Sequence, residues 1–234
     1  MHRMQSNAHS DYSAAVEDYL RAIFHLSGDE AGQRVTTSQL AERLAVRPAS
    51  VTSMVQKLAA ATPALVDYHK SHGACLTPEG KLAALGVVRC HRLLELFLHE
   101  KLGFGWDEVH DEADRLEHAI SAATADRIAE ALGHPTHDPH GHAIPDADLT
   151  LEPATGISLA DCATGATAAV RYVCDEDGDL LRYLDAIGLR PGEPVVVIRR
   201  EIENDLLWVR VGEGGSVPLG LLAATQVFVQ PHSV

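Results

Sequence analysis

The chain has 234 residues, of which 46% are hydrophobic, and its formal net charge is −14. This length suits one large domain or two small ones, and the apolar content supports folded cores, which excludes a disordered protein. No run of about 18 uninterrupted apolar residues occurs, so no membrane span is expected. The first residues, MHRMQSNAHS, lack the apolar stretch of a signal peptide, and the cysteines form no CxxC pair. These features predict a cytoplasmic protein with reduced thiols.

The acidic charge is unevenly distributed along the chain. Acidic and basic residues balance over residues 1–83, so the remaining residues carry the whole net charge. Between Arg34 and Lys57 the basic residues outnumber the single acid, Glu42. An acidic protein with one locally basic face can still bind DNA, with weak and salt-sensitive non-specific affinity.

The first 77 residues predict three helices followed by a hairpin. Apolar residues recur at helical spacing over 13–27, 36–46 and 47–60. Thr37 or Ser38 is the expected cap of the second helix, and Pro48 lies near the start of the third. Residues 65–77 read as two short strands around a turn near Ser71–Gly73. This order is that of a winged helix-turn-helix.

The rest of the chain predicts more helices and then strands. Pro78 lies just inside a long helix that runs to about Leu102, a second helix covers 106–120, and Ser121 caps a third. Residues 134–156, rich in Gly, Pro, His and Asp, have no period and indicate a linker. Short strands at 168–173, 194–202, 206–211 and 225–230, with a helix at 180–188, predict a small β-barrel. The expected fold is α+β, with a DNA-binding domain at 1–77, a helical domain at 78–133, the linker, and a barrel at 157–234.

One stretch of the chain, VHDEADRLEHAIS, concentrates imidazoles and carboxylates on one helix face. His110, Asp114, Glu117 and His118 stand at offsets i, i+4, i+7 and i+8, which share a face at 3.6 residues per turn. A solvated face usually mixes in Lys and Arg, whereas this set consists of ligands for a divalent first-row metal. Two further helices offer the same donor types, as the pair His91 and Glu95 and as Asp18.

Four segments in this order, EDYLRAI, VRPASVTSMVQKL, RCHRLLELFL and VHDEADRLEHAIS, resemble the DtxR/MntR metal-dependent repressors. The segment GLRPGEPVVV is similar to the SH3-like (FeoA-type) barrel of the longer members. The resemblance covers about residues 12–230. It implies a homodimer that binds Fe(II) or Mn(II) as corepressor, and then binds palindromic operators near metal-uptake genes.

The resemblance also implies two ligand sets. The primary site would be Asp18, Asp114, Glu117 and His118, and the ancillary site His91, Glu95 and His110, with Asp177 or its neighbours Glu176 and Asp179 added from the barrel. Iron-responsive members carry Met and Cys where this chain has Asp18 and Asp114. Oxygen donors suit Mn(II) better than sulfur does, so manganese is favoured over iron, with Co(II) or Zn(II) as substitutes in vitro.

One position departs from the short manganese-responsive members, which lack the barrel. They use a Glu in a binuclear site at the position of Arg21, and a cation cannot ligate a metal. The ancillary set of the longer members is therefore the better match.

The winged domain offers candidate DNA contacts. Arg47, Ser50, Thr52 and Ser53 are polar residues at the start of the expected recognition helix, and His69 and Lys70 lie in the wing. Ser and Thr there suit phosphate or mixed base contacts better than bidentate base readout.

Three other interpretations fit the same residues. The same architecture could respond to Fe(II) in place of Mn(II). The carboxylates and histidines could instead belong to a hydrolase with two metal ions, or to a protein that buffers metal without changing its DNA affinity. A repressor is not an enzyme and takes no small organic substrate. Glu17 is expected to face solvent, and so are the linker histidines His134, His137, His140 and His142, since loop histidines seldom ligate metal.

Overall fold

The computed structural model describes residues 12–28 and 33–231, so the N-terminal stretch considered for a signal peptide lies outside the described residues. The chain divides into two compact units, and each is described by itself. The first unit comprises Met1–Leu93, Asp114–His134 and Ile144–Glu152; the second comprises Leu94–Ala113, Pro135–Ala143 and Pro153–Val234.

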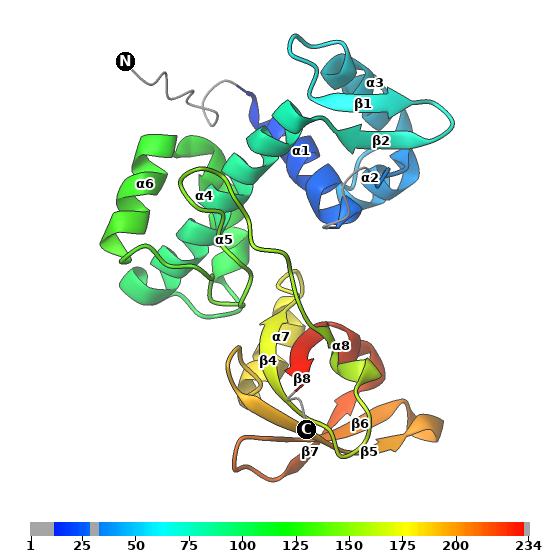
Figure 1. The fold of residues 1–234 in the computed structure, drawn as a ribbon, viewed down its shortest axis with the longest axis vertical. Coiled ribbons are helices and arrows are strands. Elements are labelled where there is room, and N and C mark those ends of the chain that lie inside the picture. The colour runs from blue at the N-terminus through cyan, green and yellow to red at the C-terminus, as the bar shows by residue number, and fades with distance from the viewer. Residues whose placement is uncertain (1–11, 29–32, 232–234) are drawn as a thin grey trace. The chain divides into compact units, whose positions relative to one another are not determined.

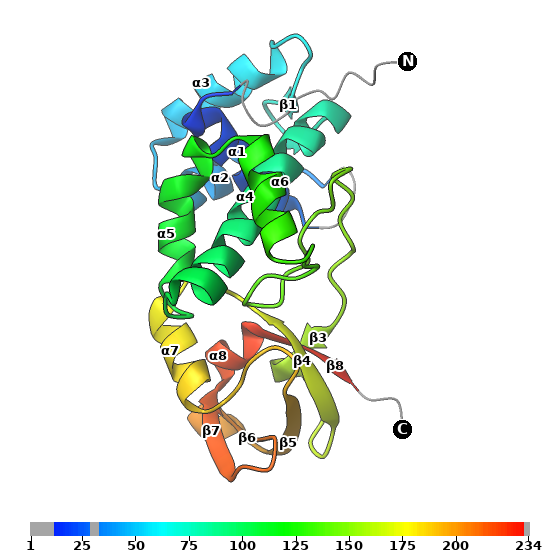
Figure 2. The ribbon, with the colours of Figure 1, turned by 90° about the vertical axis from the view of Figure 1, so that its left-hand side faces the viewer.

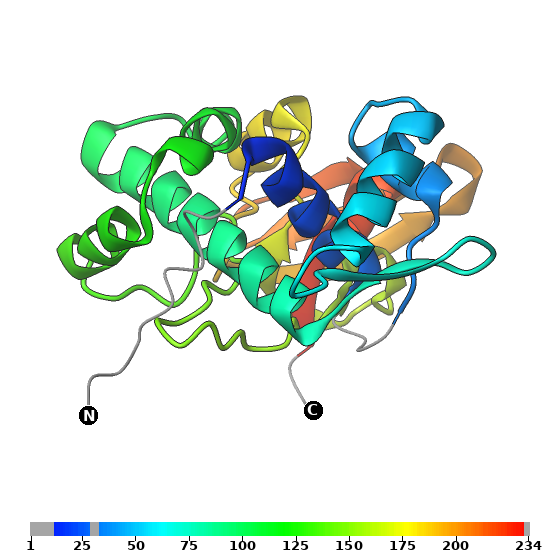
Figure 3. The same ribbon diagram turned by 90° about the horizontal axis from the view of Figure 1, so that it is seen from above.

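The first unit begins with the winged helix-turn-helix that the sequence predicts. Helices α1 (Ala14–Ser27), α2 (Thr37–Arg43) and α3 (Pro48–Ala59) precede the antiparallel strands β1 (Val66–His69) and β2 (Gly73–Leu76). The hairpin extends beside α3 (Figure 3). Leu20, Ile23, Leu40, Val51 and Val55 are fully buried in one core, which explains the helical apolar spacing. The cap of α2 is Thr36, one residue before the expected position, and it forms a capping box with Gln39.

Three further helices follow the hairpin. They are α4 (Pro78–Leu102), α5 (Val109–Leu116) and α6 (Ala122–Ala131), with a 3₁₀ turn at Glu117–Ala119. The helix expected over 106–120 is therefore shorter than predicted. The Glu108 carboxylate accepts a hydrogen bond from the Gly105 amide at 2.8 Å, and Trp106 is buried among barrel residues of the second unit. The chain before Val109 is thus fixed by other contacts than those of a helix.

The second unit contains a six-stranded antiparallel sheet in the order β3-β8-β4-β5-β6-β7 (Figures 1 and 2). Its strands are β3 (Ile157–Ser158), β4 (Thr167–Val173), β5 (Pro194–Glu201), β6 (Leu206–Val211), β7 (Ser216–Gly220) and β8 (Val227–Pro231). Helices α7 (Gly178–Ala186) and α8 (Leu221–Thr225) accompany them. The alternating burial of β4 and β5 places Val170, Val195 and Val197 in one core with Leu181. Very short β3 and Pro-containing β7 lack a strand pattern and were not predicted.

The segment between α6 and β3 has no helix or regular strand, as its composition predicts. Asp138 nevertheless orders it locally: its Oδ1 atom accepts hydrogen bonds from the amides of His140, at 2.8 Å, and His142, at 2.9 Å. Gly141 adopts a φ of +90°, and a Cβ atom there would lie 2.1 Å from the carbonyl oxygen of Arg171. Glycine is therefore required for this turn to pack against β4.

The sequence predicts no membrane-spanning helix and four reduced cysteines. Among the helices that the structure describes, none combines the length and the apolar character that crossing a bilayer requires. All four cysteines lie in the described part and are free thiols.

Candidate metal centres

One cluster of ionisable side chains lies in the first unit, where α1 meets α4, α5 and the 3₁₀ turn. It is called the helical cluster here. Its members are Glu17, Asp18, Arg21, His91, Asp114, Glu117 and His118. Ligand atoms of Asp18, Glu117 and His118 all lie within 4.8 Å of one another. This is close enough for one ion to bind all three.

Both ring nitrogens of His118 face carboxylates. Nδ1 lies 2.6 Å from Oε2 of Glu17, and Nε2 lies 2.9 Å from Oδ1 of Asp18. Burial favours the neutral ring, but the hydrogen bond to Glu17 and the charges of Glu117 and Asp18 outweigh it and raise the pKa of His118. Glu17, which was expected to face solvent, is buried with 3% of its surface exposed. It holds the ring with Nε2 toward Asp18 and Glu117, as a carboxylate behind a metal-binding histidine does.

Glu117 is the central carboxylate of the helical cluster. It is fully buried, and its Oε2 atom lies 2.7 Å from Nδ1 of His91. Its Oε1 atom lies 3.4 Å from Nε2 of His118, and no hydrogen bond to it exists among the described residues. A buried carboxylate oxygen without a donor is costly, and a cation at this point would remove that cost.

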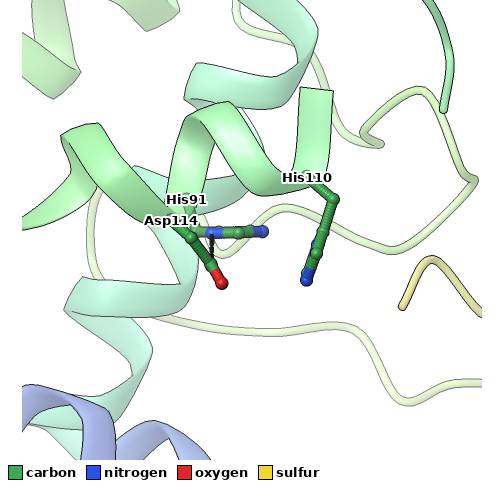
Figure 4. Close-up of side chains that lie close together, drawn as sticks. All are labelled: His91, His110 and Asp114. Carbon is green, nitrogen blue, oxygen red and sulfur yellow. Dashed lines mark ion pairs between the residues drawn. The ribbon is translucent and has the colours of Figure 1, made fainter. Parts of the chain in front are cut away.

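Arg21 fills the space between Glu117, His91 and Asp114. Its Nη1 atom lies 2.8 Å from Oδ1 of Asp114, 2.9 Å from Oε2 of Glu117 and 2.9 Å from Nδ1 of His91. Figure 4 shows the ion pair between His91 and Asp114, which measures 3.3 Å, and His110 one turn before Asp114 on α5. Of the expected primary set, Asp114 thus pairs with Arg21 and His91.

A second cluster lies within the second unit and is called the loop cluster. Its members are Glu95 and His110 from α4 and α5, Asp138, His140 and His142 from the loop, and Asp175 after β4. Oδ2 of Asp175 lies 3.7, 3.8 and 3.6 Å from the Nδ1 atoms of His110, His140 and His142. His110 also lies 3.1 Å from Oε1 of Glu95. Two donors bound to one ion at about 2.1 Å stand about 3.4 Å apart, so these separations suit shared ions.

The hydrogen bonds of His140 define its tautomer. Its Nε2 lies 2.9 Å from the carbonyl oxygen of Trp106, which can only accept, so Nε2 carries the proton of the neutral ring. Nδ1 then presents a lone pair, 3.8 Å from both Oε1 of Glu95 and Oδ2 of Asp175, and it has no hydrogen-bond partner among the described residues. A lone pair aimed at carboxylates is repulsive unless a cation lies between them. A backbone carbonyl behind the ring is the usual arrangement for a metal-binding histidine.

Within the barrel, the structure gives Asp175 and Asp177 different roles. Burial opposes ionisation of Asp175, but the positive charge of a protonated His142 favours it and lowers the pKa of that carboxyl. Asp177, the barrel residue expected to add a ligand, caps α7 by accepting hydrogen bonds from the amides of Asp179 and Leu180 at 2.9 and 3.1 Å. The described metal-ligand groups include Asp175 and neither Asp177, Glu176 nor Asp179.

The candidate DNA contacts lie on the surface of the winged domain. Arg47, Ser50, Ser53, His69 and Lys70 are exposed, and Thr52 is half-buried with its hydroxyl donating to the carbonyl of Pro48 at 3.0 Å. Ala49, Ser50, Ser53, Met54 and Lys57 line a shallow concavity along α3. Helix α3 carries no acidic residue in its first turn, and Lys57 lies in its last. This face suits phosphate contacts.

Six residues of these clusters are absent from the ligand sets that the sequence predicts. Glu17, His140 and His142 were expected to face solvent, and Asp177 or its neighbours were expected in place of Asp175. Arg21 was excluded as a cation, and Asp138 was not considered. His140 is instead fully buried and His142 half-buried, whereas His134 and His137 are exposed. The Asp-x-His-x-His spacing of 138–142 is the one signal that pointed to this loop.

Comparison with known proteins agrees with the order of domains. Residues 11–74 match the iron dependent repressor N-terminal DNA binding domain, residues 77–146 its metal binding and dimerisation domain, and residues 157–231 the FeoA domain. The diphtheria toxin repressor of Corynebacterium efficiens is 33% identical over 201 residues, which are 82% of this chain and 86% of that protein. The chain belongs to the DtxR family of iron-dependent repressors.

Some similar proteins are named for iron and others for manganese. The iron-dependent repressor IdeR of Mycobacterium tuberculosis is 30% identical over 208 residues, covering 86% of this chain and 80% of that protein. A solved manganese-dependent transcriptional repressor in complex with manganese is 38% identical, covers 93% of this chain and 100% of its own, and has a TM-score of 0.85. The expected α+β fold is confirmed, with a DNA-binding domain, a helical dimerisation domain and a β-rich FeoA domain. This DtxR-family member is a metal-dependent transcriptional repressor and not an enzyme.

Proposed function

We propose that this repressor is activated by Mn(II), and that as a homodimer it binds palindromic operators of metal-homeostasis genes. The observation that carries the choice of metal is the donor set of the helical cluster, which consists of carboxylates and imidazoles. Hard oxygen donors suit Mn(II), while thiolate and thioether ligands suit softer metals. The manganese complex among its similar structures supports the same choice.

A cysteine does lie beside the helical cluster, but it is not a ligand in this proposal. Sγ of Cys90 lies 3.6 Å from the backbone carbonyl of Glu117, toward which the thiol points its proton. Burial, together with the charges of Glu117 and Glu17, raises the pKa of Cys90 to about 12. The thiol is thus directed at a backbone carbonyl, and no cysteine belongs to the groups of metal-ligand atoms among the described residues.

The proposed ligands fall into the two clusters. In the helical cluster Asp18, Glu117 and His118 would hold one ion, with Asp114 and His91 beside it. In the loop cluster Glu95 and His110 would bind together with His140 and Asp175. A bound divalent ion would supply charge that holds α1 against the 3₁₀ turn that follows α5. The side chains orient one another: Glu17 fixes the ring of His118, and the Trp106 carbonyl fixes that of His140.

Metal and DNA binding are linked in this proposal. An ion that favours the DNA-competent conformation must tighten DNA binding, and DNA must tighten metal binding by the same factor. Arg47, Ser50, Thr52 and Ser53 would contact the operator from α3, with His69 and Lys70 on phosphates. Since the operator is chromosomal DNA, the protein would act in the cytoplasm.

The test is fluorescence anisotropy of the metal-free protein with DNA from its own upstream region, with and without Mn(II), at fixed salt. Mn(II) should raise the affinity strongly, and Fe(II), added anaerobically, should raise it less. Asp114→Ala should abolish the gain while the protein stays folded, and Asp111→Ala, exposed on the same helix, should retain it. A larger gain with Fe(II) would establish the Fe(II)-responsive alternative. An unchanged gain in Asp114→Ala would remove Asp114 from the site.

A further inference from the structure

We propose that Arg34 is a positioning residue for DNA binding, because its guanidinium clamps both strands of the wing hairpin and fixes the direction of the hairpin tip before DNA arrives. The wing hairpin is the pair of strands β1 and β2 with the turn between them, and Arg34 precedes α2. The inference rests on the proposed function, which gives phosphate contacts to His69 and Lys70 in this hairpin. Arg34 controls those contacts without being one of them.

The first argument is the set of groups that the Arg34 side chain contacts. Its Nη1 atom donates to the carbonyl oxygen of Asp67 in β1 and to that of Gly73 in β2, both at 3.2 Å. Its Nη2 atom forms an ion pair with the carboxylate of Asp67. Because the guanidinium is planar and its donors point in fixed directions, one group ties the two strands together through three acceptors. Only 26% of the Arg34 side chain is exposed.

The second argument is the backbone that carries Arg34 to the hairpin. Val35 exchanges two backbone hydrogen bonds with Ala74 of β2, at 2.7 and 2.8 Å, as a short additional strand. A Cβ atom at Gly73 would lie 2.2 Å from the carbonyl oxygen of Val35, and Gly73 has a φ of +83°. Glycine therefore permits the close approach that places Arg34 over the hairpin.

The third argument is the charge of Asp67. An unpaired carboxylate in a hairpin that meets DNA would repel the phosphates, and 50% of this side chain is exposed. Its Oδ2 atom pairs with Arg34, and its Oδ1 atom lies 3.5 Å from Nε2 of His69. The pair of Asp67 and Arg34 adds no net charge to the hairpin. Its contribution is therefore the direction of the strands.

The fourth argument is the shape of the hairpin tip. The amide of His72 donates to the carbonyl oxygen of His69 at 3.0 Å, which closes a tight turn around Lys70 and Ser71. The rings of His69 and His72 meet edge to face, and all four residues are exposed. Each strand has only four residues, and an isolated two-stranded hairpin is marginally stable in water. The direction of this compact tip therefore depends on what holds the base of the hairpin.

The test measures DNA affinity as a function of salt, with saturating Mn(II) and DNA from the upstream region of the gene. Arg34→Ala should weaken binding to this DNA and to a scrambled fragment alike. It should also reduce the slope of log affinity against log salt by about 1, because Lys70 loses its phosphate. Lys81→Ala, exposed on α4, controls for the loss of one positive charge and should keep the slope. Arg34→Ala combined with Asp67→Ala has the net charge of the unaltered chain but no clamp, and should show the reduced slope.

A double-mutant cycle distinguishes positioning from general stability. Arg34→Ala should have no further effect on the salt slope in a chain that carries Lys70→Ala, because it acts through that side chain. Ethylation interference should show that Arg34→Ala loses the phosphates contacted by the wing hairpin and keeps those contacted by α3. Additive effects of the two substitutions would overturn the inference, and so would a normal slope in the charge-balanced double variant.

A further readout needs neither DNA nor metal. Backbone amides of residues 66–76 should exchange hydrogen faster in Arg34→Ala, while those of α3 should exchange at the unaltered rate, because only the hairpin loses its clamp. Unchanged exchange in residues 66–76 would contradict the clamp. If Arg34→Ala does not fold, as judged by circular dichroism, Arg34→Gln takes its place in every measurement.

The outcomes also separate this inference from the proposed function. If Lys70→Ala reduced the salt slope and Arg34→Ala did not, only the inference would fail. If Mn(II) did not raise the DNA affinity of the unaltered chain, the proposed function would fail, and the salt slopes without Mn(II) would still decide the role of Arg34. If Lys70→Ala and removal of the His69 ring both left the slope unchanged, the wing contacts and the inference would fail together.

Discussion

The helical cluster and the loop cluster contain the same kinds of donors but satisfy them differently. In the helical cluster Arg21 already supplies a positive charge to Asp114 and Glu117. In the loop cluster the closest partners of Asp175 are three imidazoles, and Nδ1 of His140 has no hydrogen bond among the described residues. A candidate metal site is therefore better judged by the charges and hydrogen bonds that its ligand atoms already have in the metal-free protein than by its residue types alone. One cluster already contains a cationic side chain, and under the proposed function the other would depend more on an added ion.

The largest expected effect is that of Glu117→Gln, which removes the fully buried carboxylate at the centre of the helical cluster. Mn(II) affinity there should fall by more than about 100-fold, beyond the loss typical of a residue behind a ligand. Metal-dependent DNA binding should be lost with it, because the two are linked. Isothermal titration and anisotropy measure the two effects. Glu130→Gln, exposed on α6, is the control, and Mn(II) affinity that survives in Glu117→Gln would separate Glu117 from the site.

The next effect distinguishes the two aspartates of the barrel. Asp175→Asn should weaken the metal affinity of the loop cluster by roughly 10–100-fold and leave the helical cluster unaffected. Asp177→Ala should lower the free energy of unfolding by about 1 kcal/mol through loss of the α7 cap, with metal binding intact. Metal titration and denaturant unfolding test both variants. The reverse result, metal loss in Asp177→Ala only, would return the barrel ligand to Asp177.

The smallest effect is expected for Glu17→Gln. The amide can still accept a hydrogen bond from Nδ1 of His118, but the negative charge behind the ring is lost. Mn(II) affinity should fall about 10-fold, at the low end for residues that orient a ligand, and the number of bound ions should not change. Titration calorimetry compares it with Glu79→Gln on exposed α4 surface. An unaltered affinity would mean that Glu17 contributes to packing alone.

The sequence predicts the fold well because the helices of the first unit follow apolar periodicity. Residues such as Leu20, Ile23 and Val55 are spaced for one face and are buried together. The start of α5 was misplaced because Trp106 fits a helical pattern locally but is buried in the barrel core. Side-chain capping at Thr36, Glu108 and similar positions moves helix ends by a few residues, which periodicity does not register.

The candidate sites were predictable only where a helix fixes the spacing. His110 and Asp114 lie one turn apart on α5 for that reason, and Glu117 and His118 follow in the 3₁₀ turn. In loops no regular period relates the number of a residue to the direction of its side chain. The sequence alone therefore does not distinguish the role of Asp175 from that of Asp177. Their roles differ because β4 ends just before Asp175 and α7 begins just after Asp177. The burial of His140 was not predicted for the same reason, because it depends on the turn at Gly141 and on the contact with Trp106.

Gly141 also has a consequence for the genetics of this repressor. Every missense codon at this position adds at least a methyl group where the Arg171 carbonyl oxygen already stands, 2.1 Å away. A saturation-mutagenesis screen can measure derepression of a reporter gene at high manganese. Substitutions at position 141 should therefore derepress the reporter as strongly as substitutions of the neighbouring histidines do. Alleles at 141 would then form one phenotypic class with alleles at 140, although glycine has no side chain to bind a metal.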